Sequence, residues 1–236
     1  MKLFCFPYAG GSSGIFREWQ AGLSPDIEMI AVELAGRGRR IHEEHYCNVD
    51  ALIDDIFPLI ADDVTAGDYA FFGHSMGGMI AHELALRIED MDLAQPRQLF
   101  FSGRGAPHIK CPDDKLFHLM SDEEFKKEVL NLGGTPPEFF EHKELLKLFL
   151  PLLKNDFRLA EEERPRESLC PLSSNITIFL GKDDDLTAEE CQGWNRHTKG
   201  VCTIHYFNGG HFFLHNEMPR IGAIINQTLL EVSAMH

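Results

Sequence analysis

Residues 69–77 read Tyr-Ala-Phe-Phe-Gly-His-Ser-Met-Gly, an apolar run followed by the pattern G-x-S-x-G. The run Tyr69–Phe72 predicts a buried strand, and apolar residues at helical spacing predict a helix over Ser75–Glu89. A serine between a strand and a helix lies in a tight, strained turn that lifts its hydroxyl clear of the sheet. Gly73 and Gly77 let the strand and helix approach closely. Ser75 is therefore the expected nucleophile of a serine hydrolase.

The residues on either side of this serine have different expected roles. The backbone N–H of Met76 lies at the positive end of the predicted helix, where it can stabilise an oxyanion. We expect His74 to be structural, because a side chain adjacent in sequence to Ser75 cannot easily turn back to it. A glycine-rich turn with an incidental serine is the alternative, and the flanking strand and helix argue against it.

The rest of the chain alternates short apolar runs with helical patterns. This alternation predicts a mostly parallel sheet with helices on both faces, an α/β-hydrolase fold within a single domain over residues 1–236. Pro58 warns of a kink or break in its helix. The further strands expected are Leu3–Phe6, Ile27–Leu34, Gln98–Ser102, Ile176–Leu180 and Cys202–Phe207, and the further helices are Val49–Val64 and Ile221–Val232.

The stretch from about residue 113 to residue 167 departs from this alternation. It contains helix patterns at Asp122–Leu132, Pro137–Phe140 and Lys143–Lys154, and no convincing strand pattern. A helical insertion between two strands of such a sheet predicts a lid over the active site. The alternative is an ordinary helical crossover that only packs on the sheet.

A nucleophilic serine needs a base and an acid, which follow it in this order in the fold: serine, acid, histidine. His211 is the expected base, because it follows the last predicted strand and the flexible pair Gly209-Gly210. Twelve histidines are present, so a core or surface histidine is the alternative there. Asp184 is the expected acid, three residues after Gly181. Its acidic neighbours at positions 183 and 185 leave the register open.

A second oxyanion donor is expected from the loop Phe6–Ser12, whose glycines leave backbone N–H groups accessible. Ala9 is the residue we expect to provide it. Two histidine patterns resemble metal sites, His42–His45 and the pair His211 and His215. The first lacks the H-E-x-x-H spacing, and the second is better explained by a catalytic base. We therefore expect no metal and no cofactor.

Composition narrows the class of protein further. The formal net charge of −15 over 236 residues argues against nucleic-acid binding and against anionic membrane surfaces. The six cysteines are scattered without metal-like spacing. No signal peptide and no run long enough to span a bilayer are recognised. A cytoplasmic protein with free thiols is the expectation.

Six short motifs are spread along the chain: Phe6–Gly11, Leu34–Arg37, Phe72–Gly77, Ser102–Arg104, Leu132–Pro136 and Gly209–Phe213. With these motifs the chain resembles the type II thioesterases of nonribosomal peptide and polyketide biosynthesis over nearly its whole length. The Gly-Gly-Thr-Pro segment and the N-terminal loop are more specific than the serine motif, which many hydrolases share.

The resemblance implies an editing enzyme that hydrolyses misprimed or stalled acyl groups from the phosphopantetheine arm of acyl or peptidyl carrier proteins. It implies a helical lid and a monomer. Ala35 stands where the family commonly has proline. An arginine cluster offers possible contacts for an acidic carrier, although a solvated cluster is the alternative; its members are Arg37, Arg39, Arg40 and Arg104.

Two other functions stay open from the sequence. The serine motif does not separate a thioesterase from a general carboxylesterase or lipase, so only the resemblance distinguishes them. A non-catalytic binding protein with a hydrolase fold is the third reading, and the presence of Ser75, Asp184 and His211 argues against it.

Overall fold

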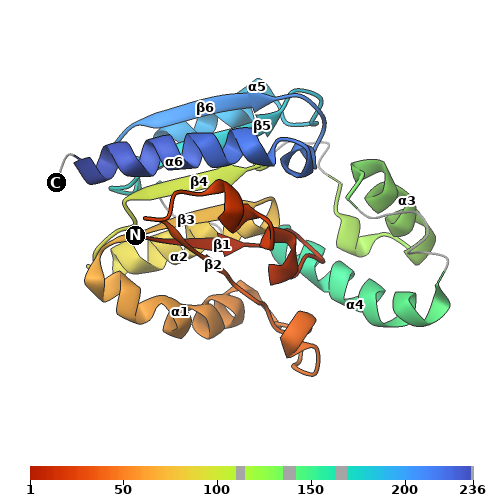
Figure 1. The fold of residues 1–236 in the computed structure, drawn as a ribbon. Coiled ribbons are helices and arrows are strands. Elements are labelled where there is room, and N and C mark those ends of the chain that lie inside the picture. The colour runs from red at the N-terminus through yellow and green to blue at the C-terminus, as the bar shows by residue number, and fades with distance from the viewer. Residues whose placement is uncertain (110–114, 135–141, 163–168, 235–236) are drawn as a thin grey trace.

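A computed structural model describes residues 1–109, 115–134, 142–162 and 169–234 (Figure 1). Its centre is a six-stranded sheet in the order β2-β1-β3-β4-β5-β6. All neighbouring strands in this sheet run parallel. The strands are β1 (Lys2–Phe6), β2 (Glu28–Ala31), β3 (Tyr69–His74), β4 (Gln98–Ser102), β5 (Asn175–Gly181) and β6 (Cys202–Phe207). The predicted parallel sheet is confirmed.

One strand is shorter than the sequence predicts. β2 ends at Ala31, whereas the apolar pattern suggested a strand as far as Leu34. Val32 and Leu34 are buried in the core although they lie beyond the ladder. An apolar pattern reports burial, and here burial continues after strand pairing has stopped.

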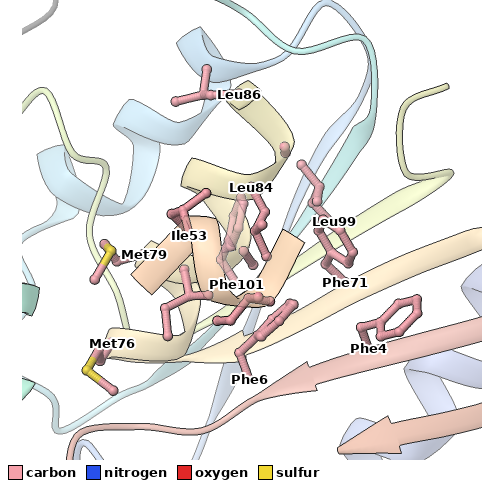
Figure 2. Packing of buried hydrophobic residues seen from close by; sticks show 14 of the residues in the cluster. Phe4, Phe6, Ile53, Phe71, Met76, Met79, Leu84, Leu86, Leu99 and Phe101 are labelled. Atoms are coloured by element: carbon pink, nitrogen blue, oxygen red, sulfur yellow. The ribbon is translucent and has the colours of Figure 1, made fainter. Parts of the chain in front are cut away.

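Helices cover both faces of the sheet. Successive residues of a strand point to opposite faces, so each strand supplies side chains to two separate cores. On β1, Phe4 and Phe6 belong to one core cluster and Leu3 and Cys5 to the other. Figure 2 shows the first cluster, where Phe4 and Phe6 pack beside Phe71. That cluster lies under α1 (Val49–Ala66) and α2 (Met76–Asp90) and includes Cys191 of α5 (Ala188–Gly193). The opposite cluster lies under α6 (Met218–Ala234) and the short 3-10 helices η1 (Ser13–Phe16) and η2 (Trp19–Gly22).

The expected break at Pro58 does not occur, since α1 continues through it. Both Pro58 and Asp54, four residues earlier, are exposed. Proline removes the hydrogen bond to the Asp54 carbonyl. On an exposed face water can replace that partner, which limits the cost of the proline.

The helical insertion between β4 and β5 consists, in its described part, of η4 (Phe117–Leu119), α3 (Asp122–Leu132) and α4 (Lys143–Ala160). A capping box between Ser121 and Glu124 starts α3. The insertion has its own small core, centred on Phe125, Val129 and Leu153. In Figure 1, α3 and α4 lie beyond one end of the sheet. The predicted helix Pro137–Phe140 lies outside the described residues.

Among the described residues, no helix combines the length and apolar character needed to cross a membrane.

Candidate active site

Ser75 connects β3 to α2 with a backbone conformation that is rare for a residue with a side chain. Its φ is 53° and its ψ is −114°. Such a conformation costs about 1–3 kcal/mol and persists only where the surroundings enforce it. Here the Ser75 N–H donates to the Ser102 carbonyl at 2.7 Å, and the Ser75 carbonyl accepts from Gly78 N at 2.9 Å. The turn is therefore fixed on both sides of the serine.

The two glycines of the motif are required by close backbone contacts. A Cβ on Gly73 would lie 2.0 Å from the Gly77 carbonyl oxygen. A Cβ on Gly77 would lie 2.1 Å from the Phe6 carbonyl oxygen. Since both obstacles are backbone atoms, no side-chain rotation can relieve them. The G-x-S-x-G spacing thus follows from the packing of α2 against β1 and β3.

We expect Gly77→Ala to destabilise the protein by more than about 3 kcal/mol, because the added methyl group forces β1 and α2 apart. Thermal unfolding and labelling of Ser75 by a fluorophosphonate probe measure the effect. Gly22→Ala is the matched control, because a Cβ there meets no atom within 4 Å. A Gly77→Ala protein with an unchanged melting temperature would contradict this account of the turn.

His211 and Asp184 are brought together by the loops that follow β6 and β5. The His211 Nδ1 lies 3.1 Å and 3.3 Å from the two Asp184 carboxylate oxygens. The side chains are 17% and 8% exposed, respectively. Asp183 and Asp185 are exposed. Of the adjacent carboxylates, Asp184 therefore has the position needed to orient the imidazole.

The two loops are held together through their backbones. Asp183 N donates to the Gly209 carbonyl at 3.0 Å, and Lys182 N donates to the Phe207 carbonyl at 2.9 Å. A Cβ on Gly181 would lie 2.5 Å from the Gly210 oxygen. These contacts fix the separation of Asp184 and His211 independently of their side chains.

The carboxylate also determines which ring nitrogen of His211 carries the proton. A carboxylate at Nδ1 favours the tautomer with hydrogen on Nδ1, which leaves Nε2 free to accept a proton. His211 and Ser75 line the same cavity. The arrangement can therefore support proton transfer from a serine hydroxyl.

His74 lies behind this site and is fully buried. Its Nδ1 lies 2.9 Å from the Ser102 hydroxyl, and its ring centroid lies 5.1 Å from that of His211. Burial, and then the neighbouring histidines His211 and His215, hold the pKa of His74 well below its usual value. His74 is consequently neutral at pH 7 and places no positive charge next to His211.

A cavity of about 190 Å³ separates the serine from the helical insertion. The sequence did not predict its apolar wall, although Val129 and Leu132 lie on the apolar stripe of α3. The residues lining it are Tyr8, Ala9, Ser75, Phe117, Val129, Leu132, Gly134, Leu153, Phe157, His211 and Phe212. An apolar group attached to a carbonyl at Ser75 can occupy this space.

Of the two expected oxyanion donors, Met76 directly follows Ser75 in the chain and Ala9 lines the same cavity as Ser75. Met76 is the first residue of α2, and the first four N–H groups of a helix have no partner within it. Ala9 lines the cavity, in the loop after β1. The loop after β1 thus reaches the cavity that the serine lines.

The arginine cluster is not the exposed basic surface that the sequence suggested. Arg37 is 4% exposed and forms an ion pair with Asp156 at 2.6 Å. Arg40 pairs with Asp55 and Glu43. Arg104 donates to the Ala160 carbonyl at 3.0 Å, and Arg39 is exposed. The prediction of a carrier contact through Arg37 is therefore wrong, because the guanidinium of Arg37 is buried against Asp156.

Comparison with characterised proteins places this geometry in a family. Linear gramicidin dehydrogenase LgrE of Brevibacillus parabrevis is 38% identical over 96% of this chain and 87% of its own length. Gramicidin S biosynthesis protein GrsT of Aneurinibacillus migulanus is 36% identical over 91% and 83%, respectively. The crystal structure of ClbQ from the colibactin NRPS/PKS pathway superimposes with a TM-score of 0.91 at 33% identity, covering 100% of this chain and 99% of ClbQ.

The thioesterase domain model matches residues 1–229, nearly the full chain. The parallel sheet, the strained serine and the Asp184–His211 pair all lie within this match. The chain belongs to the thioesterase domain family.

Proposed function

We propose that this chain is a type II editing thioesterase, which hydrolyses misprimed or stalled acyl groups from the phosphopantetheine arm of carrier proteins. The observation that carries the proposal is a strained serine that faces an apolar cavity next to an Asp184–His211 pair. Family membership and the relatives named above support it, since ClbQ is named for the colibactin NRPS/PKS pathway and GrsT for gramicidin S biosynthesis.

In the first half of the proposed reaction, Ser75 attacks the thioester carbonyl while His211 Nε2 takes the hydroxyl proton. Asp184 keeps the imidazole oriented and stabilises the imidazolium. The N–H groups of Met76 and Ala9 stabilise the negative oxygen of the tetrahedral intermediate. The carbon–sulfur bond then breaks, and His211 returns the proton to the pantetheine sulfur as it leaves.

In the second half, water attacks the acyl-serine, with His211 as the base. The ester bond breaks, the free acid departs and Ser75 regains its proton. Neither half of the proposed reaction needs a metal or a cofactor.

We further propose that the insertion of about residues 113–167 is a lid within the single domain. Its support is the cavity wall, because Val129, Leu132 and Phe157 of the insertion line the same space as Ser75. A lid over this space would exclude water until the carrier delivers its acyl group. An acidic carrier would approach this acidic chain mainly through apolar contacts. We further propose that the enzyme is a cytoplasmic monomer.

The name of LgrE includes a dehydrogenase activity, which is a second function to consider. Dinucleotide-binding loops follow the spacing G-x-G-x-x-G and open into a helix. Here the glycines stand at positions 10, 11 and 14, and the loop opens into the four-residue 3-10 helix Ser13–Phe16. This loop therefore lacks the dinucleotide-binding spacing, which argues against hydride transfer at this position.

A comparison of two substrates with the same acyl group distinguishes the thioesterase from a general esterase. We expect kcat/KM to be higher for the acyl thioester on a carrier protein than for the corresponding p-nitrophenyl ester. Brisk turnover of the ester without release from the carrier would instead identify a general carboxylesterase. A fluorophosphonate that fails to label Ser75 would indicate a non-catalytic protein.

A further inference from the structure

Asp156 of α4 is a fully buried carboxylate at the junction of three segments. Its Oδ2 accepts a hydrogen bond from Gly10 N at 2.7 Å, in the loop after β1. The same oxygen accepts from Arg37 Nη1 at 2.6 Å, and Oδ1 accepts from Arg37 Nη2 at 2.8 Å. One carboxylate thus joins the helical insertion to the loop that contains Ala9 and to the loop after β2.

Arg37 extends the same network. Besides its two bonds to Asp156, it donates from Nη1 to the Gly11 carbonyl at 3.2 Å and from Nε to the Ala35 carbonyl at 3.3 Å. The arginine therefore holds both the carboxylate and the next peptide of the glycine loop. A two-pronged arginine–carboxylate pair fixes geometry as well as charge.

The packing around Gly10 reinforces this arrangement. Gly10 has a φ of +75°, and a Cβ there would lie 2.7 Å from Leu153 and 2.8 Å from Phe149, both on α4. Phe149, Leu153 and Asp156 share one face of the helix, at spacings of four and three residues. The helix thus lies directly on the residue that follows Ala9 in the chain.

The orientation of one peptide group decides where the neighbouring N–H groups point. With Gly10 N–H directed at Asp156, the turn from Tyr8 to Gly11 closes through a hydrogen bond from Gly11 N to the Tyr8 carbonyl at 2.9 Å. Both N–H groups that follow Ala9 are therefore occupied by protein acceptors. Ala9 lines the cavity with Ser75, and its N–H has no such protein acceptor among the described residues, so it can serve a substrate oxygen.

We propose that Asp156 is a positioning residue for oxyanion stabilisation: it holds Gly10, and Arg37 holds Asp156, so that the Ala9 N–H faces the reacting carbonyl. The inference rests on the proposed function, because it takes Ala9 as an oxyanion donor. On this proposal, the Leu34–Arg37 motif supplies the arginine that holds Asp156 and the glycine loop in place. It also means that α4 cannot leave the site without disturbing the loop.

The test replaces the ion pair with apolar side chains of similar size, Arg37→Met together with Asp156→Leu. Such replacements of buried pairs are often neutral for stability, so the variant is expected to fold. Because Gly10 loses its acceptor, we expect kcat for a p-nitrophenyl ester to fall about 10- to 100-fold, with KM within about twofold of wild type. Affinity for a trifluoromethyl ketone, which forms a tetrahedral oxyanion on Ser75, should fall by a similar factor.

Arg87→Met with Asp54→Leu is the control, since the structure gives this arginine–aspartate pair between α2 and α1 no hydrogen bond or ion pair to the described loop Pro7–Ser12 or to Arg37. Its kcat and its affinity for the ketone should remain within about twofold of wild type. A purely structural role of Asp156 predicts a lower melting temperature with unchanged kcat and ketone affinity of the folded protein. That result would overturn the proposal.

Should the double variant not fold, Asp156→Asn decides the question. The asparagine oxygen can serve Gly10 N and Arg37 Nη1 as Oδ2 does now, but the amide NH2 group then opposes Arg37 Nη2 and breaks the second bond that fixes this side chain. A kcat reduced about tenfold at constant KM supports the positioning role, and a kcat within about twofold of wild type overturns it. Because the ester and the ketone report on Ser75 directly, a wild type inactive on carrier thioesters would refute the proposed function separately.

Discussion

Replacing Ser75 with alanine is expected to lower kcat by about 10⁵-fold or more, because no other group can form the acyl intermediate. The variant should keep its melting temperature within a few degrees, since alanine keeps both backbone hydrogen bonds of the turn, from residue 75 N to the Ser102 carbonyl and from Gly78 N to the residue 75 carbonyl. Steady-state hydrolysis of an acyl thioester and thermal unfolding measure the two quantities.

Labelling with a fluorophosphonate supplies the control for this prediction. The probe should modify the wild type at a single site and leave Ser75→Ala unlabelled. If the variant kept more than about one percent of wild-type activity, Ser75 would not be the nucleophile and the mechanism would be wrong.

Replacing Asp184 with asparagine is expected to lower kcat about 10⁴-fold, with little change in KM. The amide favours the wrong tautomer of His211, so Nε2 is no longer available as a base. The Asp184 side chain is 8% exposed and lies 3.1 Å from His211 Nδ1. The expected loss of kcat therefore comes from this one contact between the carboxylate and the imidazole. Kinetics at the pH optimum of the wild type give the comparison.

The adjacent acidic residues provide controls of the same charge and nearly the same position. Asp183→Asn and Asp185→Asn remove exposed carboxylates, and each should leave kcat within about twofold of wild type. A large loss of kcat in either control, together with an active Asp184→Asn enzyme, would show that Asp184 is not the catalytic acid.

The sequence predicted the central sheet well, because the apolar runs of its strands end at the glycines and turn residues where the strands themselves end. β4 and β6 begin and end as predicted, and the turn at Ser75 follows from glycines that backbone contacts require. The length of β2 was overestimated, because Val32 and Leu34 stay buried after pairing ends. The continuity of α1 through Pro58 depends on exposure, which a periodicity pattern does not contain.

The site was harder to predict where it depends on contacts between distant segments. Position after a strand and glycine pointed to Asp184 and His211, although three adjacent carboxylates left the register open. The apolar wall of the cavity and the Arg37–Asp156 pair join residues more than a hundred positions apart. Local spacing carries no information on such pairs, so Arg37 was interpreted as a surface residue.

The most direct measurement loads a carrier protein with a short acyl-phosphopantetheine and follows release of the acyl group by mass spectrometry. The wild-type chain and Ser75→Ala are compared under identical conditions. We expect rapid release by the wild type and none above background with the variant. Absence of release by a wild type that hydrolyses a simple ester would contradict the assignment as a carrier-directed thioesterase.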